Sequence, residues 1–263
     1  MQHPDFLHET ATLAAQQPLA SGYVLLTLHA PRIAAQARPG QFIHARIPGL
    51  ENSALRRPFS IYDAQGEMLS ILYKRVGRGT EQLAALAPGV PIDFIGPLGN
   101  GFPALCEGMT PVLVAGGYGV APLHFFARRV TTRGHLTRGH LFVGGRTASD
   151  ILCVDAFENL SWTVHITTED ASLGIHGRVT DALLPWFVRN QAPVEIFACG
   201  PDGMLRALSQ LDVPTWVSLD KHMVCGVGAC LACVQKIRQP DGSAAQLRVC
   251  HDGPIFEARS VVW

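Results

Sequence analysis

Four of the seven cysteines lie close together near the end of the chain, spaced as Cys225-x4-Cys230-x2-Cys233 and followed by Cys250. The other three stand singly, at Cys106, Cys153 and Cys199. A secreted disulfide scaffold would be shorter and would spread its cysteine pairs along the whole chain. The clustered cysteines therefore predict a metal site rather than disulfides.

The spacing of these cysteines indicates the kind of metal site. A plant-type [2Fe–2S] cluster takes its ligands from C-x4-C-x2-C and a distant fourth cysteine, whereas a structural zinc site usually has two C-x2-C pairs. The chain has one such pair. A [2Fe–2S] cluster is therefore predicted, with zinc as the alternative, and its ligands would be Cys225, Cys230, Cys233 and Cys250. The nearby His222 and His251 are interpreted as ordinary loop residues.

The residues between the predicted ligands suit a cluster. Gly226 and Gly228 allow the backbone to turn tightly and to direct N–H groups at sulfur atoms. Apolar side chains in the same stretch are expected to keep water away from the cluster, which tunes its reduction potential. These side chains are Val227, Ala229, Leu231 and Ala232.

Two glycine-containing loops each follow an apolar run that is typical of a buried strand. Gly116, Gly117 and Gly119 come after residues 111–115, and Cys199-Gly200-Pro201 comes after residues 194–198. Such a loop can place N–H groups around a phosphate, but the first lacks the full G-x-G-x-x-G fingerprint and a tight turn explains it equally well. Since open α/β sheets bind ligands beyond the carboxyl ends of their strands, both loops are predicted to border one crevice.

The stretch Arg57-Pro58-Phe59-Ser60 places a guanidinium and a hydroxyl close together. Arg57 could pair with a pyrophosphate through two parallel hydrogen bonds, and Ser60 could hydrogen-bond the edge of a flavin ring. Taken alone, the residues favour a surface arginine beside the start of a strand.

The elements that position these residues fall into three segments. Residues 1–107 contain short apolar or alternating runs at 23–28, 41–47 and 69–73, separated by Pro and Gly turns, which predicts a small β-barrel with one helix at 80–86. Residues 108–216 alternate strands with helices and so predict a parallel sheet. The expected strands and helix are residues 111–115, 140–144, 163–167 and 194–198, with a helix at 123–130. Residues 217–263 form a third, small unit around the cysteines.

Composition excludes several classes of protein. The 263 residues carry no net charge and are 48% hydrophobic, so disorder is not expected. Nucleic-acid binding needs an excess of Lys and Arg, and the chain has 21 of these against 21 acidic residues. No apolar stretch approaches the ~18 residues of a membrane span. Because the first residues also lack a secretory signal, we expect a soluble, cytoplasmic protein.

The order of the motifs along the chain is informative. After Arg57–Ser60 come Gly77-Arg78-Gly79-Thr80, Gly96-Pro97-Leu98-Gly99, the first glycine-containing loop and Cys199-Gly200-Pro201. In this order the first 215 or so residues resemble the ferredoxin reductase-like flavoproteins, with an FAD-binding barrel followed by a pyridine-nucleotide domain. Residues 218–233 and 249–256 narrow the resemblance to the electron-transfer subunits of type B dihydroorotate dehydrogenase.

The resemblance implies two sets of binding residues. Those for FAD are Arg57, Pro58, Phe59, Ser60, Leu72, Tyr73, Lys74, Gly79 and Thr80, where Lys74 stands in place of a frequent arginine. Those for NAD are Gly116, Gly117, Gly119, Cys199, Gly200 and Pro201. No general acid or base is expected, because the cofactors perform the redox steps.

The resemblance also implies the protein's role in pyrimidine biosynthesis. Electrons would leave dihydroorotate through FMN on a separate catalytic subunit, pass the [2Fe–2S] cluster and FAD, and reach NAD. The expected assembly is a heterotetramer with two of each chain. Two alternatives stay open: a related reductase subunit serving ferredoxin, sulfur or hydrogenase chemistry, and a non-catalytic zinc-binding adaptor, which would be colourless.

Overall fold

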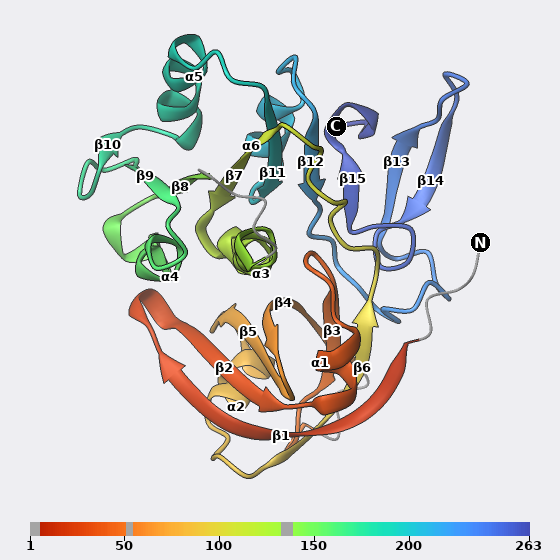
Figure 1. Cartoon of the computed structure of the whole chain (residues 1–263). Coiled ribbons are helices and arrows are strands. Elements are labelled where there is room, and N and C mark those ends of the chain that lie inside the picture. The colour runs from red at the N-terminus through yellow and green to blue at the C-terminus, as the bar shows by residue number, and fades with distance from the viewer. Residues whose placement is uncertain (1–5, 51–54, 133–138) are drawn as a thin grey trace.

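The structure, a computed structural model, describes residues 6–50, 55–132 and 139–263. Figure 1 shows a barrel formed by the N-terminal part of the chain, an α/β layer above it, and the C-terminal strands beside that layer. The predicted combination of a β-barrel, a parallel sheet and a small C-terminal unit is confirmed.

The barrel is antiparallel and closes in the strand order β1-β2-β5-β4-β3-β6, so its strands have no free edge. Side chains alternate along each strand: Leu26 and Leu28 point into the barrel, while Tyr23 packs towards the α/β layer. The strands are β1 (Leu7–Pro18), β2 (Tyr23–His29), β3 (Phe42–Arg46), β4 (Arg57–Gln65), β5 (Met68–Lys74) and β6 (Pro91–Leu98). Between them lie η1 (Ala20–Gly22), α1 (Pro31–Gln36) and α2 (Arg78–Ala84).

The second sheet has the order β10-β9-β8-β7-β11-β12-β15 and is parallel except for β15. Its central strands are buried on both faces, which explains their unbroken apolar sequences. The strands are β7 (Thr110–Gly116), β8 (His140–Gly145), β9 (Thr163–Thr168), β10 (Ile175–His176), β11 (Val194–Cys199), β12 (Thr215–Ser218) and β15 (Ile255–Glu257).

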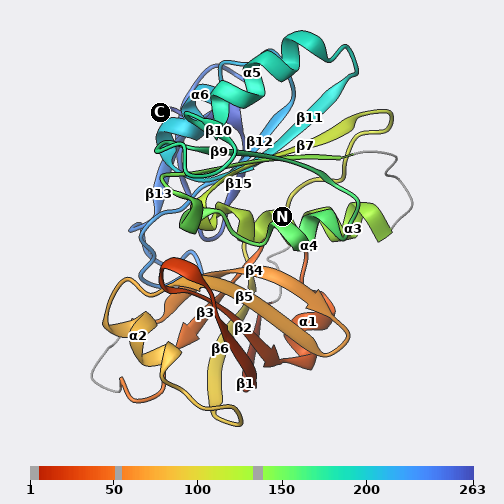
Figure 2. The ribbon, with the colours of Figure 1, turned by 90° about the vertical axis from the view of Figure 1, so that its left-hand side faces the viewer.

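Helices cover both faces of this sheet. Figure 2 shows α3 and α4 between the sheet and the barrel, and α5 and α6 on the opposite face. Helix α3 packs on β4, where the rings of His124 and Tyr62 stack with their centroids 4.2 Å apart and Arg128 pairs with Asp63. The helices and short turns are η2 (Gly117–Gly119), α3 (Val120–Thr132), η3 (Ala148–Asp150), α4 (Val154–Glu158), α5 (Val179–Arg189) and α6 (Asp202–Leu208).

The C-terminal segment forms a hairpin of β13 (Val234–Arg238) and β14 (Ala244–Arg248), and then returns to the central sheet. There β15 pairs with β12 in the antiparallel register Trp216↔Glu257, and η4 (Ala258–Ser260) follows it. The proposed domain boundaries after residues 107 and 216 stay a prediction. The last segment is nevertheless joined to the sheet by main-chain hydrogen bonds.

Most of the elements expected from the sequence are present. The seven predicted strands correspond to β2, β3, β5, β7, β8, β9 and β11, and the two predicted helices to α2 and α3. The other elements had no predicted range; among them are β1, whose alternation is carried by small residues such as Ala11, and the short helix α1.

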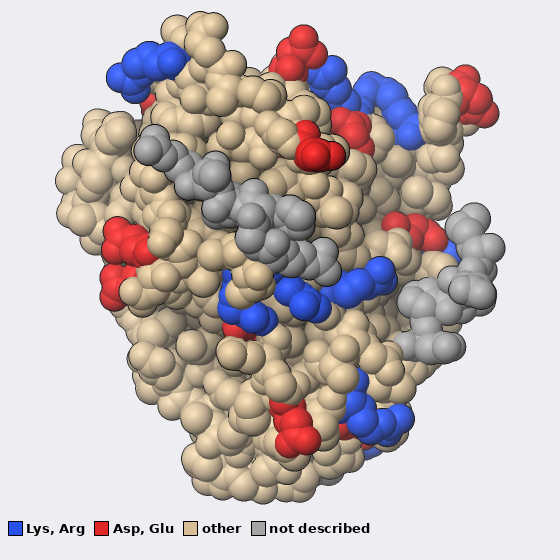
Figure 3. All heavy atoms as spheres, in the orientation of Figure 1, with Lys and Arg blue, Asp and Glu red and all other residues tan. Residues whose placement is uncertain are grey.

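Charged side chains are sparse and make up 16% of the chain. Figure 3 shows one face that is mostly uncharged, with some Lys and Arg side chains in a short band across its middle and the other charged side chains scattered. Within the described ranges, no helix has both the length and the apolar character needed to cross a membrane.

Candidate cofactor and metal sites

The two glycine-containing loops meet at the point where the strand order of the sheet reverses. The chain passes from β7 to β8 on one side, and β11 lies on the other side of β7, so the loops after β7 and β11 border one crevice. A Cβ placed on Gly119 would overlap the carbonyl of Cys199, and one on Gly116 would lie 2.5 Å from Cδ of Pro201. These positions therefore require glycine. The structure brings together Gly116, Gly117, Gly119, Cys199, Gly200 and Pro201.

The thiol of Cys199 lies at the edge of this crevice. Burial, reinforced by the charge of Asp220, raises the pKa of Cys199 to about 12, so the thiol is neutral at physiological pH. The hydroxyl of Tyr118 donates to Oδ2 of Asp220 at 3.0 Å. This hydrogen bond links the first glycine loop to the segment that leads to the clustered cysteines.

Three of the predicted FAD residues form a group beside the barrel. Nε of Arg57 lies 3.0 Å from the position that a Cβ on Gly79 would take. Thr80 Oγ1 accepts the N–H of Gly77 at 3.2 Å and that of Val76 at 2.9 Å, which fixes the start of α2. The guanidinium, the glycine and the start of this helix therefore lie together, as a pyrophosphate site requires.

The other predicted FAD residues point in two directions. Phe59 and Tyr73 lie inside the barrel with their ring centroids 5.5 Å apart, so their side chains belong to its core. The side chains of Leu72 and Lys74 point outwards; Nζ of Lys74 lies 3.6 Å from Oδ1 of Asp150 in η3. Pro58 and Ser60 share the outward face of β4. The role of these residues in FAD binding stays a prediction.

The four clustered cysteines gather from two loops. The N–H of Cys230 points at Sγ of Cys225 at 3.4 Å, and the N–H of Cys250 points at Sγ of Cys233 at 3.4 Å. Cys233 and Cys250 are buried, while Cys225 and Cys230 are partly exposed. The cysteines therefore lie as two pairs, one nearer to the surface than the other.

The electrostatic surroundings favour the thiolate form of Cys225, which belongs to the outer pair. Burial works to raise the pKa of Cys225, but main-chain N–H groups of the loop that follows outweigh it and lower this pKa to about 7. Burial raises the pKa of Cys250 to about 12, with hydrogen bonding to Cys233 adding to the effect. Positive φ angles at Gly226 (71°) and Gly228 (80°) produce the turn that aims these N–H groups inwards.

The cysteine arrangement fits a two-iron cluster. In the described part of the chain, no three His, Cys, Asp or Glu side chains converge as they would around one metal ion. The two thiol pairs, Cys225 with Cys230 and Cys233 with Cys250, instead suit a cluster, which spreads its ligands over two irons. Cys225, Cys230, Cys233 and Cys250 would hold it, as the spacing predicts.

The prediction that four apolar side chains keep water away from the cluster is wrong for three of them. Only Val227 packs against the core, whereas Ala229, Leu231 and Ala232 are exposed, Leu231 by 71%. The reason is geometric, because a loop that turns its N–H groups inwards turns its side chains outwards.

The motif Gly96-Pro97-Leu98-Gly99 has a structural explanation. It ends β6 and leads to Asn100, whose N–H donates to the carbonyl of Gly253 at 2.6 Å. A Cβ on Gly99 would lie 2.6 Å from Cδ of Pro254, so this position requires glycine. The motif therefore fastens the barrel to the loop that carries Cys250.

His44, in β3, was missed by the sequence analysis. It is fully buried and stands opposite Pro58 in the register of β3 and β4. A Cβ on Gly226 would overlap its Nδ1. Burial, reinforced by the guanidinium of Arg56, lowers the pKa of His44 to about 4, although the main chain of Cys225 acts in the opposite direction. The only sequence signal was a polar residue within an apolar strand.

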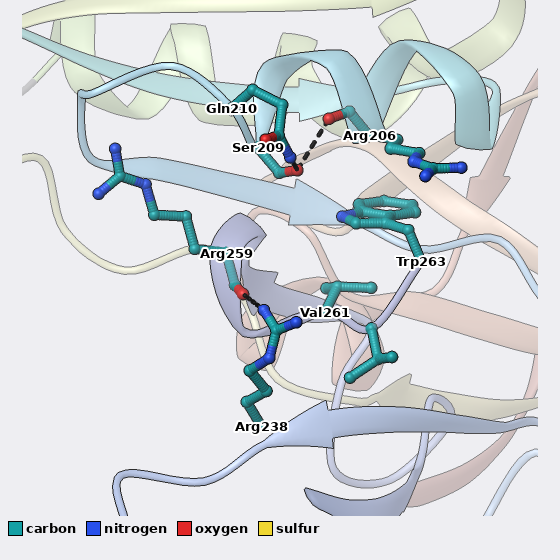
Figure 4. A pocket seen from close by; sticks show the side chains of 8 residues that line it. Arg206, Ser209, Gln210, Arg238, Arg259, Val261 and Trp263 are labelled. Carbon is teal, nitrogen blue, oxygen red and sulfur yellow. Dashed lines mark hydrogen bonds between the residues drawn. The ribbon is translucent and has the colours of Figure 1, made fainter. Parts of the chain in front are cut away.

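A separate hollow of about 480 Å³ lies near the C-terminus. Figure 4 shows the Trp263 indole among arginine side chains there. Arg259 pairs with Asp212 and also donates to the carbonyl of Leu211. No predicted cofactor residue is among the lining residues, which are Arg206, Ser209, Gln210, Arg238, Arg259, Val261, Val262 and Trp263.

Two family profiles match the chain at these sites. The iron–sulfur cluster binding domain of dihydroorotate dehydrogenase B matches residues 220–262, which include all four clustered cysteines. The oxidoreductase NAD-binding domain matches residues 113–210, which include both glycine-containing loops. The chain therefore has an iron–sulfur domain and an NAD-binding domain.

Relatives match the chain along nearly its whole length. The dihydroorotate dehydrogenase B (NAD(+)) electron transfer subunit of Bacillus caldolyticus is 38% identical, over 97% of this chain and 98% of its own. That of Enterococcus faecalis is 35% identical with the same coverage. A chain of the NADH-dependent reduced ferredoxin-NADP oxidoreductase, studied for flavin-based electron bifurcation, superposes with a TM-score of 0.83 at 30% identity, covering 97% of this chain and 90% of its own. The chain belongs to the family of the dihydroorotate dehydrogenase B electron transfer subunits.

Proposed function

We propose that this chain works in the cytoplasm with a separate FMN-containing subunit that oxidises dihydroorotate, and delivers the resulting electrons to NAD. One observation carries the proposal: three candidate sites lie on the barrel and on the sheet above it. They are the loop that contains Cys225 and Cys230, the group around Arg57, and the crevice between the two glycine-containing loops. When bound, FAD exchanges two electrons with NAD whereas a [2Fe–2S] cluster exchanges one at a time, so together they join two kinds of redox chemistry.

The chain's own residues bind and position. Arg57 pairs with the pyrophosphate of FAD, beside a helix start that Thr80 holds in place. The N–H groups of the loops at Gly116 and Gly200 face the phosphates of NAD. Cys199, as a neutral thiol, would pack beside the nicotinamide of a bound NAD and would perform no nucleophilic step.

Exposed apolar side chains beside the cysteines support a protein partner. Leu231 is 71% exposed and Val224 is 45% exposed, on either side of the loop that contains Cys225 and Cys230. Large apolar side chains at the surface around a functional loop are typical of an interface. We propose that the catalytic subunit covers this loop, in a heterotetramer with two of each chain.

Anaerobic affinity purification of the chain from its host tests the proposal. A co-purifying subunit with FMN, together with dihydroorotate-dependent reduction of NAD by the complex, is the expected result. The Cys230→Ser chain, purified in the same way, serves as the control and should lose this activity. A complex that lacks FMN, or that does not reduce NAD when dihydroorotate is added, contradicts the proposal.

A ferredoxin-linked reductase subunit is the second candidate. The structural likeness to the ferredoxin-NADP oxidoreductase chain, with a TM-score of 0.83, favours it. Reduction of ferredoxin by the purified complex with NADH, without any response to dihydroorotate, would support this candidate.

A further inference from the structure

His44 lies between the group around Arg57 and the loop that contains Cys225. Its strand, β3, pairs with β4, and His44 stands opposite Pro58 in the stretch Arg57-Pro58-Phe59-Ser60. Cross-strand partners project from the same face of a sheet. Since Ile43 and Phe59 point into the barrel, His44 and Pro58 project outwards.

On this outward face, His44 meets the cysteine loop. A Cβ on Gly226 would overlap Nδ1 of His44, so the ring lies against the main chain directly after Cys225. The glycine at this position serves two purposes: it allows the positive φ of 71°, and it leaves space for the imidazole. One side chain from the barrel therefore sets how closely the cysteine loop can approach β4.

The surroundings of the imidazole are unusual for a buried histidine. The residue has no exposed surface, and neither ring nitrogen has a hydrogen-bond partner among the described residues. Buried polar groups are nearly always paired, because an unpaired donor costs about 1–3 kcal/mol. A leucine or phenylalanine would fill this space without that cost, so packing alone does not explain a histidine here.

We propose that His44 is a positioning residue for the iron–sulfur cluster: its imidazole holds the Cys225–Gly226 segment at a fixed distance from the strand of the FAD site, and its N–H polarises that segment. The inference rests on the proposed function, because it needs both cofactors. An N–H dipole near a cluster favours the reduced, more negative state, and therefore raises the reduction potential.

Two substitutions separate the volume of the ring from the dipole of its N–H group. His44→Phe keeps a planar ring and removes the N–H, whereas His44→Gln keeps a donor. His29→Gln is the control, since His29 is exposed at the end of β2 and pairs with Glu67. Each full-length chain is purified anaerobically and assayed for FAD and iron per chain, and the cluster is titrated by EPR at controlled potentials.

We expect His44→Phe to retain FAD and to lower the cluster's midpoint potential. At the wild-type midpoint, the ratio of reduced to oxidised cluster should fall about threefold or more, a downward shift of about 30 mV for a one-electron couple. His44→Gln should recover at least half of this shift, and His29→Gln should match the wild type. Loss of iron in His44→Phe with FAD retained, and recovery of iron in His44→Gln, would also support the role.

Other outcomes overturn the inference. An unchanged potential in His44→Phe, equal shifts in His44→Phe and His44→Gln, or joint loss of FAD and iron in both variants would reduce His44 to a packing residue. A wild-type chain without iron or flavin would instead contradict the proposed function itself, so the two failures are distinguishable.

Discussion

Gly119 packs directly on the carbonyl group of Cys199, so that a Cβ at position 119 would overlap main-chain atoms at position 199. We expect Gly119→Ala to push the two loops apart and to weaken NADH binding about tenfold or more, since overpacking costs typically 1–3 kcal/mol and tenfold is about 1.4. FAD and iron content should not change. NADH titration of the flavin spectrum measures the effect.

Gly203→Ala is the matched control for this substitution. Gly203 lies in α6, close to the same crevice, and a Cβ there would meet nothing within 4 Å. Equal NADH affinities for the two variants would show that the Gly119 contact does not shape the site.

Cys230→Ser separates the cluster from the flavin. The variant should lose electron delivery to the partner subunit, because serine is a poor cluster ligand, while it still binds FAD and oxidises NADH with artificial two-electron acceptors. Cys106→Ser, outside the cysteine loop, should behave as the wild type. If Cys230→Ser also lost its flavin, the cluster and FAD units would not fold independently, and the three-part division would be wrong.

Arg57→Lys tests the pyrophosphate contact. Lysine keeps the charge but loses the planar fork, so FAD affinity should fall about tenfold, in line with the ~1.5–3 kcal/mol of hydrogen bonds to charged groups. FAD fluorescence after equilibrium dialysis measures the loss. Arg32→Lys is the control: Arg32 lies in α1 and hydrogen-bonds the carbonyl of His8. Unchanged FAD affinity in Arg57→Lys would remove Arg57 from the FAD site.

The thiol of Cys199 should stay unreactive at neutral and mildly alkaline pH. Its pKa is raised to about 12, so the neutral form persists below that pH, and at pH 9 the thiolate fraction is about one in a thousand. Iodoacetamide should therefore modify the exposed Cys106 and leave Cys199 intact until the chain is unfolded. Mass spectrometry of peptides from pH 7, 8 and 9 checks this. Labelling of both cysteines at one rate would contradict it.

Gly226→Ala should impair cluster assembly for two reasons. The positive φ costs an alanine roughly 1–2 kcal/mol, and its Cβ would overlap His44. Gly242→Ala is the control for backbone strain away from the cysteines, since Gly242 lies in the turn between β13 and β14 with a φ of 84° and free space around it. Iron content per chain should be lower in Gly226→Ala than in Gly242→Ala. Equal iron contents would mean that contact with His44 has no effect.

Features that depend on neighbouring residues could be predicted from the sequence. The spacing from Cys225 to Cys233 and the apolar runs of β7 and β11 are local patterns, and each element lies where its pattern indicates. The contact of the two glycine-containing loops also follows from a general rule, because parallel strands end at the same edge of the sheet.

Features that depend on distant pairings could not be predicted. The position of His44 depends on the register of β3 and β4, and on a loop about 180 residues further along the chain. The inward rings of Phe59 and Tyr73 depend on which face of each strand lies inside the barrel. The outward side chain of Leu231 depends on how the cysteine loop turns. None of these is fixed by residues close in sequence.

Strand β15 has a kinetic consequence. Its pairing with β12 holds one end of the cysteine segment in the central sheet, and the hydrogen bond from Asn100 to Gly253 holds it to the barrel. A segment anchored in this way cannot swing between donor and acceptor. With both cofactors bound, electrons would cross a gap of constant width, and we expect the rate of exchange between them not to depend on solvent viscosity.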